Sequence, residues 1–113
     1  MPNKRSLESK FVAILEANHL ERTSKIFNLG DRLYLPDFVF NDLIVEVSEE
    51  VTARKIDTIK EFKHSSPSYR IVLLTDGDDK VIDGATHFDE SFDLGSIKVL
   101  LSEIKKSLRG KSK

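Results

Sequence analysis

The residues with the clearest chemical potential are two acids, Asp37 and Glu46, near the ends of a predicted β-hairpin. Apolar runs lie on both sides of Asn41-Asp42, a dipeptide that can take the positive-φ conformations of a two-residue turn. With that turn, counting outward along the two runs places Asp37 directly opposite Glu46. Directly opposed residues share one face of a sheet, so the two carboxylates are expected to lie side by side.

Such a pair of acids needs a physical reason, because like charges opposite each other destabilise a sheet. A hard divalent cation with oxygen ligands would remove the repulsion. Glu46 lies in the apolar run Leu43–Val47, where a carboxylate must be solvated, paired or bound to metal. Two simpler interpretations stay open: Asp37 as an ordinary acid at a strand start, and Glu46 as a solvent-facing side chain.

The composition is that of one globular domain covering residues 1–113. Hydrophobic residues make up 39% and charged residues 33% of the chain, which favours a folded, soluble protein. The absence of cysteine excludes a disulfide framework and a thiolate zinc site. No apolar run approaches the roughly 20 residues of a membrane span, and the start lacks a signal-peptide core. We therefore expect a cytoplasmic protein with no membrane partner.

The formal net charge of −1 does not suggest a protein that coats nucleic acid, whose domain is usually basic. The basic residues are nevertheless unevenly placed, and the local field is the one that acts on a partner. One group is Arg54, Lys55, Lys60 and Lys63, and the other is Lys105, Lys106, Arg109, Lys111 and Lys113.

Three segments have the apolar spacing of amphipathic helices, each with a serine at its start that could cap it. They run from about 6 to 18, 48 to 63 and 96 to 108, and start at Ser6, Ser48 and Ser96. The basic tail 109–113 is expected to be flexible.

Strands are predicted between these helices. The ranges are about 22 to 29, 33 to 40, 43 to 48 and 69 to 75, with short strands at 81–82 and 85–88. The run Tyr69–Thr75 is nearly continuous in apolar residues and indicates a strand buried on both faces. The order helix, three strands, helix, strand predicts an α/β fold with a central mixed sheet flanked by helices, plus a C-terminal helix.

This order, together with Pro36-Asp37 and then Glu46-Val47-Ser48, resembles the PD-(D/E)xK nuclease superfamily. Restriction enzymes, Holliday-junction resolvases and repair nucleases belong to it. Its motif has an acid after proline near the second strand, then an acid and a lysine two residues apart on the third. The resemblance covers about residues 6–75 and implies a restriction-endonuclease-like αβββαβ core.

The chain departs from the motif at Ser48, where the family has its lysine. In some members that lysine lies on the following helix, and Lys55 is the best substitute here because its helical stripe is otherwise apolar. Its stem would lie over the core with the ammonium directed toward the carboxylates. Arg54 and Lys60 are weaker substitutes, each one residue off the stripe. The stripe consists of Val51, Lys55, Ile59 and Phe62.

The resemblance implies a catalytic site with Mg²⁺ or Mn²⁺ held by Asp37, Glu46 and the backbone carbonyl of Val47. Lys55 would orient a water molecule or stabilise charge on the phosphate. Glu8 matches an acid that recurs on the first helix of many members. Its expected role is to hold a second metal or a metal-bound water.

The implied substrate is DNA. Its backbone would be contacted by Arg54, Lys60, Lys105, Lys106 and Arg109 without reading sequence. Because the chain has no base-reading module, we expect a structure-selective or non-specific endonuclease, or one that depends on a specificity partner protein. Cutting both strands would need a homodimer. The candidate interfaces are the terminal helix and residues 81–88.

The main alternative is a catalytically degenerate nuclease-fold module that binds nucleic acid or a partner protein, which Ser48 favours. A receiver-like signalling domain, suggested by Asp76 after a buried strand, is disfavoured because the chain lacks regular strand–helix alternation. The acidic residues that follow Asp76 lack the spacing of an EF-hand loop and are interpreted as a solvated turn. The histidines have no metal-ligand spacing: His19, His64 and His87.

Overall fold

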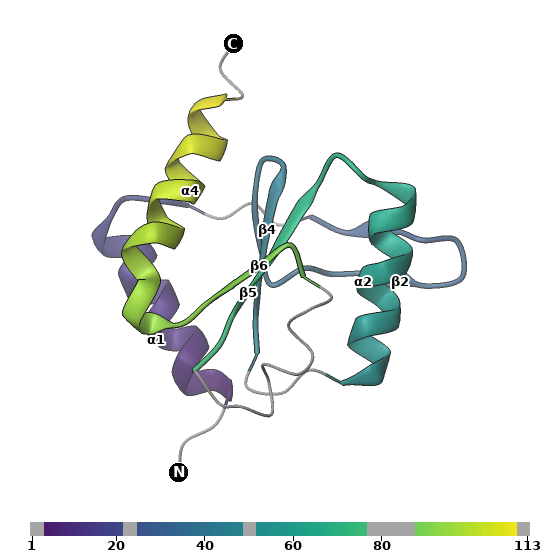
Figure 1. Ribbon diagram of the computed structural model, residues 1–113, viewed down its shortest axis with the longest axis horizontal. Coiled ribbons are helices and arrows are strands. Elements are labelled where there is room, and N and C mark those ends of the chain that lie inside the picture. The colour runs from purple at the N-terminus through teal and green to yellow at the C-terminus, as the bar shows by residue number, and fades with distance from the viewer. Residues whose placement is uncertain (1–3, 22–24, 49–51, 77–87, 111–113) are drawn as a thin grey trace.

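The computed structural model describes residues 4–21, 25–48, 52–76 and 88–110 (Figure 1). Its elements, in chain order, are α1 (Lys4–Ala17), β1 (Phe27–Asn28), β2 (Leu33–Tyr34), β3 (Phe38–Phe40), β4 (Leu43–Val47), α2 (Ala53–Ser65), β5 (Arg70–Leu74), β6 (Glu90–Phe92), the 3₁₀ turn η1 (Leu94–Ser96) and α4 (Ile97–Gly110).

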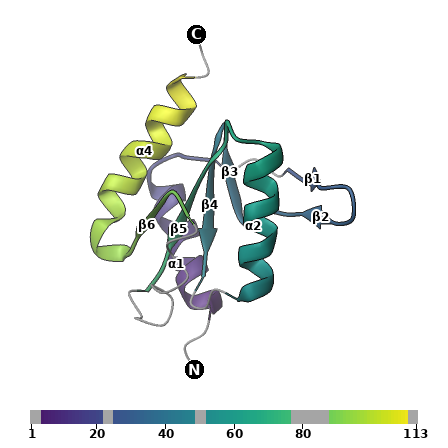
Figure 2. The ribbon, with the colours of Figure 1, turned by 45° about the vertical axis from the view of Figure 1, so that its right-hand side comes forward.

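The main sheet has four strands in the order β3-β4-β5-β6. The β3–β4 pair is antiparallel, whereas β5 runs parallel to β4 and to β6. Strands β1 and β2 form a separate antiparallel ribbon that projects beyond α2 (Figure 2). Helices α1 and α4 lie on one side of the main sheet and α2 on the other (Figure 1). The predicted α/β class with a mixed sheet between helices is confirmed.

Alternation along β4 divides the core between the two faces of the sheet. Leu43, Val45 and Val47 pack with α1 and α4, while Ile44 packs with Ile59 and Phe62 of α2. By the same alternation the Glu46 side chain faces α2. The carboxylate therefore lies on the face of the sheet that α2 covers.

The strand predicted at 33–40 is wrong as a single element, because it breaks between β2 and β3 at Leu35–Asp37. Pro36 lies in this break and has no N–H to donate to a ladder. The strand predicted at 22–29 is reduced to β1 within the described residues.

The caps predicted for the helices also differ from the structure. Helix α1 begins before Ser6, and α2 begins at Ala53 with Thr52 as its N-cap, accepting a bond from the Lys55 N–H at 3.1 Å. Ser48 instead continues the sheet, since its N–H donates to the Leu74 carbonyl at 3.0 Å. A serine before an apparent helix resembles a cap in sequence, but the backbone N–H of Ser48 is hydrogen-bonded to β5 of the sheet.

The C-terminal segment is more helical than predicted. Asp93 and Ser96 form a reciprocal capping box around η1, and α4 continues to Gly110, so Arg109 belongs to the helix rather than to a flexible tail. Residues 81–82 and 85–87, assigned to short strands, lie outside the described residues. Among the described residues that follow, Glu90–Phe92 form the strand β6. Within the described ranges no helix is long and apolar enough to cross a membrane.

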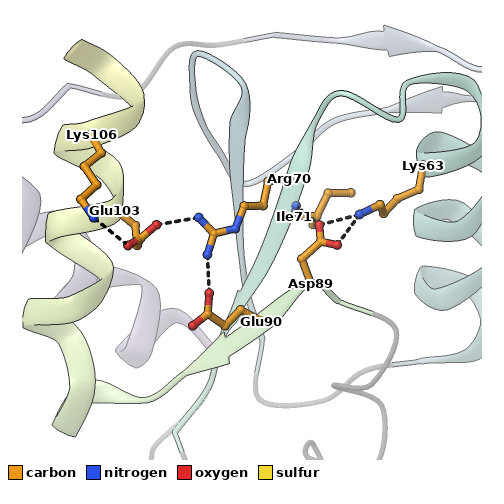
Figure 3. Close-up of polar contacts among 7 residues, drawn as sticks. All are labelled: Lys63, Arg70, Ile71, Asp89, Glu90, Glu103 and Lys106. Carbon is orange, nitrogen blue, oxygen red and sulfur yellow. Dashed lines mark hydrogen bonds and ion pairs between the residues drawn. The ribbon is translucent and has the colours of Figure 1, made fainter. Parts of the chain in front are cut away.

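Arg70 links the start of β5 to α4 and β6 (Figure 3). Its guanidinium donates to Glu103 on α4 at 2.6 Å and to Glu90 on β6. Lys106 lies 3.8 Å from the other oxygen of Glu103. Both acids around this arginine are therefore compensated by positive charge.

A second ionic contact links α2 to the start of β6. Lys63 pairs with Asp89, and the Asp89 carboxylate also accepts the buried backbone N–H of Ile71 at 2.7 Å (Figure 3). We call the charged residues of both contacts the edge network: Lys63, Arg70, Asp89, Glu90, Glu103 and Lys106.

Candidate functional site

The hairpin pairs in the register predicted from the sequence. Phe38 lies opposite Val45 and Phe40 opposite Leu43, and Asn41 has a φ of 58° in the turn. Continuing this register by one pair beyond the end of β3 places Asp37 across from Glu46.

Glu46 is buried, with 1% of its surface exposed, and both of its carboxylate oxygens accept hydrogen bonds. Lys55 Nζ donates to Oε1 at 2.8 Å, and the Tyr34 hydroxyl donates to Oε2 at 2.6 Å. The backbone N–H of Asp37 makes a longer bond of 3.4 Å to Oε2. The interpretation of Glu46 as a solvent-facing side chain is therefore wrong.

Asp37 is half-buried and braces the neighbouring strand. Its Oδ2 accepts the backbone N–H of Val47 at 2.9 Å, so each acid accepts an N–H from the segment that carries the other. This mutual bracing holds the two acidic segments together at the end of the hairpin. We call Tyr34, Asp37, Glu46 and Lys55 the cavity cluster.

Burial raises the pKa of Glu46, and the negative charge of Asp37 raises it further, whereas Lys55 and Tyr34 oppose the shift. Burial likewise raises the pKa of Tyr34, with the charge of Glu46 adding to it. Tyr34 consequently stays protonated near neutral pH and acts as a hydrogen-bond donor.

Lys55 reaches Glu46 from the first turn of α2, as it must if it takes the place of the family lysine that is absent at position 48. Burial alone would lower its pKa, but Glu46, followed by Asp37 and Glu8, holds the pKa above its ordinary value. Of the predicted stripe, Ile59 and Phe62 are buried and Val51 lies outside the described residues.

The cavity cluster opens onto a cavity of about 250 Å³. Its wall is formed by Tyr34, Leu35, Asp37, Glu46, Thr52, Arg54, Lys55 and Thr58. Arg54 is exposed at its rim. The cavity thus combines an acid from the start of the hairpin, an acid from β4 and two basic side chains from the following helix.

The donor set fits a hard divalent cation. Mg²⁺ in proteins commonly uses one or two carboxylates and completes its shell with waters and substrate phosphate. Within the described part of the chain, no three carboxylate or imidazole residues form a potential metal-binding group. Glu8, on α1, is near enough for its charge to act on Lys55, but it does not form such a group with Asp37 and Glu46 there.

The structure separates the basic residues predicted to contact DNA. Arg54 and Lys60 lie on α2, while the other three lie on α4, across the sheet: Lys105, Lys106 and Arg109. Only Arg54 of these five lines the cavity.

Tyr34 is the site residue that sequence reasoning missed. It is 5% exposed, and its ring packs against Phe62 with centroids 5.1 Å apart and lies 6.2 Å from that of Phe27. A buried tyrosine hydroxyl needs a hydrogen-bond partner, and this requirement was the available signal. The partner could not be assigned because the tyrosine lies on a ribbon outside the main sheet.

Comparison of the chain with protein-family models, with curated proteins and with solved structures gives no match. The functional argument therefore depends on the residues and geometry of the cavity cluster itself.

Proposed function

We propose that this protein is a metal-dependent endonuclease that hydrolyses DNA phosphodiester bonds, with a site of the PD-(D/E)xK type. The observation that carries the proposal is the position of Lys55, whose Nζ lies 2.8 Å from the buried Glu46 carboxylate in a cavity also lined by Asp37. Two acids and one lysine in one cavity are the side chains that this chemistry uses. Here the lysine comes from α2, since position 48 is serine.

Asp37 and Glu46 would hold Mg²⁺ or Mn²⁺, with the carbonyl of Val47 as a further oxygen ligand. When bound, the cation supplies Lewis acidity toward the scissile phosphate and lowers the pKa of a bound water. The carboxylates would fix its place relative to the cavity, and their own positions are held by bonds from backbone N–H groups.

Lys55 would provide a positive charge beside the reacting phosphate, in a partly buried position where electrostatic stabilisation is stronger than in water. Arg54 at the rim would contact the DNA backbone, as a bidentate guanidinium does with phosphate. Neither residue reads a base, which agrees with structure-selective or non-specific cutting.

The element order supports a restriction-endonuclease-like core. Helix α1 precedes four strands, β1 to β4, of which β3 and β4 belong to the main sheet, and then α2 and the parallel strand β5 follow. In this arrangement the residue just before β3 and a residue of β4 supply the acids, and α2 supplies the lysine.

Cleavage of labelled DNAs tests the proposal. Duplex, single-stranded, flap and four-way-junction DNAs are incubated with Mg²⁺ or Mn²⁺, using the wild-type protein and Glu46→Ala in parallel. We expect metal-dependent cutting that the substitution abolishes. No cutting of any substrate with either metal would refute the enzyme and favour the degenerate module, for which DNA binding would be indifferent to Glu46→Ala.

Cutting both strands of a duplex requires two active sites, one from each of two copies of the chain, so we expect a homodimer. Val99, 52% exposed on α4, gives that helix an apolar contact point for a second copy. Sedimentation of the wild-type protein and of Val99→Lys would test this interface: the wild type should be dimeric and the variant monomeric.

A further inference from the structure

Both carboxylate oxygens of Glu46 already accept hydrogen bonds. Oε1 accepts Lys55 at 2.8 Å, and Oε2 accepts Tyr34 at 2.6 Å together with the weaker contact from the Asp37 backbone. If Glu46 is a metal ligand, as the proposed function requires, the cation would compete with these donors for the lone pairs of the carboxylate. The structure indicates which donor yields more easily, because the two strong donors are held very differently.

Tyr34 is held firmly. It is 5% exposed, and its ring, carried by β2, is packed against Phe62. Across the ribbon it is paired with Phe27 in the backbone register. Moving the hydroxyl away from Glu46 would disturb this packing, and a displaced tyrosine hydroxyl inside the core would lose its partner.

Lys55 is held much less firmly. Its side chain is 24% exposed and lines an open cavity, so the ammonium can leave Glu46 without leaving water or disturbing the core. The four-carbon stem of a lysine rotates freely and the ammonium has no fixed donor geometry. A divalent cation and an ammonium also repel each other at a single oxygen, since both are positive.

We propose that Lys55 yields Oε1 of Glu46 to the divalent cation, whereas Tyr34 is a positioning residue that keeps Oε2. This inference rests on the proposed function. In the metal-free protein the ammonium compensates the buried carboxylate. Once displaced, it stays in the cavity with Asp37 and Arg54, where the phosphate of a substrate would meet it.

Calorimetric titration with Mn²⁺ alone gives the first test, at an alkaline pH that keeps the carboxylates ionised. Lys55→Met removes the competing ammonium and should bind Mn²⁺ on the order of tenfold more tightly, because hydrogen bonds to charged groups are among the stronger ones. Arg54→Met removes the same charge from the same cavity without removing a Glu46 donor, and should change the affinity much less. Equal affinities for wild type and Lys55→Met would overturn the inference.

Magnetic resonance of the wild-type protein gives a second test that needs no variant. During titration with Mg²⁺, the ¹⁵N signal of the Lys55 ammonium should move to that of a solvated lysine, while that of Lys63, paired with Asp89, stays in place. The chain has two tyrosines, so the ¹³Cζ signals of Tyr34 and Tyr69 can be followed individually. Tyr34 should keep its hydrogen-bonded shift. Loss of that shift, with the Lys55 signal unmoved, would show that Tyr34 rather than Lys55 yields its oxygen of Glu46, and would overturn the inference.

Glu46→Gln separates failure of this inference from failure of the proposed function. If the wild-type protein binds Mn²⁺ and Glu46→Gln does not, the metal site stands, and the Lys55 and Tyr34 results alone decide the inference. If neither protein binds Mn²⁺, the proposed function fails and the inference fails with it.

Discussion

The cavity cluster and the edge network use the same side-chain types in opposite ways. In the edge network Arg70 and Lys63 each neutralise acids at the border of the sheet, and the Arg70 side chain is 41% exposed. In the cavity cluster two acids lie across from each other, Lys55 pairs with Glu46, and the Glu46 side chain is 2% exposed. The edge network pairs opposite charges where water already screens them. The cavity cluster brings like charges together where burial makes them unfavourable.

The difference indicates which cluster serves the fold. A buried carboxylate next to a second one does not help a sheet to form, whereas pairs at the sheet border join α2, β5, β6 and α4. Local features that work against stability are typical of functional sites. Substitutions of matched residues should therefore change different properties: cleavage in the cavity cluster and stability in the edge network.

The largest contrast is expected between Glu46→Gln and Glu90→Gln, which change the same side chain in the two clusters. Glu46→Gln should reduce cleavage by about 1000-fold or more, because it removes the charge that holds the cation. Glu90→Gln should leave cleavage unchanged and lower the free energy of unfolding by at most about 1 kcal/mol. Initial cleavage rates and urea unfolding measure the two effects. A Glu46→Gln protein that unfolds during purification would instead make Glu46 a structural residue.

The next contrast is between Lys55→Met and Lys63→Met. Loss of Lys55 should slow cleavage by about 100-fold, as expected for one electrostatic donor, even though Mn²⁺ is bound more tightly. Lys63→Met should cleave like the wild type and lose at most about 1 kcal/mol of stability. Single-turnover rates at saturating metal separate chemistry from binding. Wild-type rates in Lys55→Met would remove Lys55 from the mechanism.

Much of the fold could be predicted from local patterns. The positive-φ Asn41 turn and the alternating runs around it set the hairpin register, and the apolar run around Ile71 and Val72 identifies β5. These signals succeed because the side chains that determine each element lie within it.

The errors arose where distant residues decide the outcome. Ser48 directly follows β4 and donates its backbone N–H to Leu74, and Thr52 caps α2 instead. Tyr34 belongs to the site because packing against Phe62 brings its hydroxyl to Glu46. No spacing rule in the sequence reports these contacts, since each depends on how the ribbon, the sheet and α2 are packed.

A smaller effect is expected in the edge network from a pair of changes at one position. Asp89→Ala leaves the buried N–H of Ile71 without its acceptor and should lower the free energy of unfolding by about 1 to 3 kcal/mol. Asp89→Asn keeps an acceptor oxygen and should cost less, at most about 1 kcal/mol for the lost ion pair with Lys63. Urea unfolding of both variants gives the comparison. Equal losses would mean that the ion pair, rather than the backbone bond, dominates.

The smallest effect is a pH dependence carried by Asp89. Burial would raise its pKa, but the bonds from Lys63 and from the Ile71 N–H hold the pKa below the ordinary value. A depressed pKa means that the folded protein binds this proton less readily than the unfolded chain does. The stabilisation is therefore fully present above the ordinary carboxylate pKa and is lost as the pH falls through the depressed value.

Urea unfolding of wild type and Asp89→Asn across the acidic range isolates this contribution. The stability difference between them should be constant near neutral pH, at about 1 kcal/mol or less, and should shrink as the pH falls below the ordinary carboxylate pKa. Cleavage by the two proteins at neutral pH should be equal, because Asp89 lies outside the cavity cluster. A stability difference that grows in acid would contradict the assigned direction of the Asp89 pKa. It would also mean that the edge network, like the cavity cluster, does not stabilise the fold.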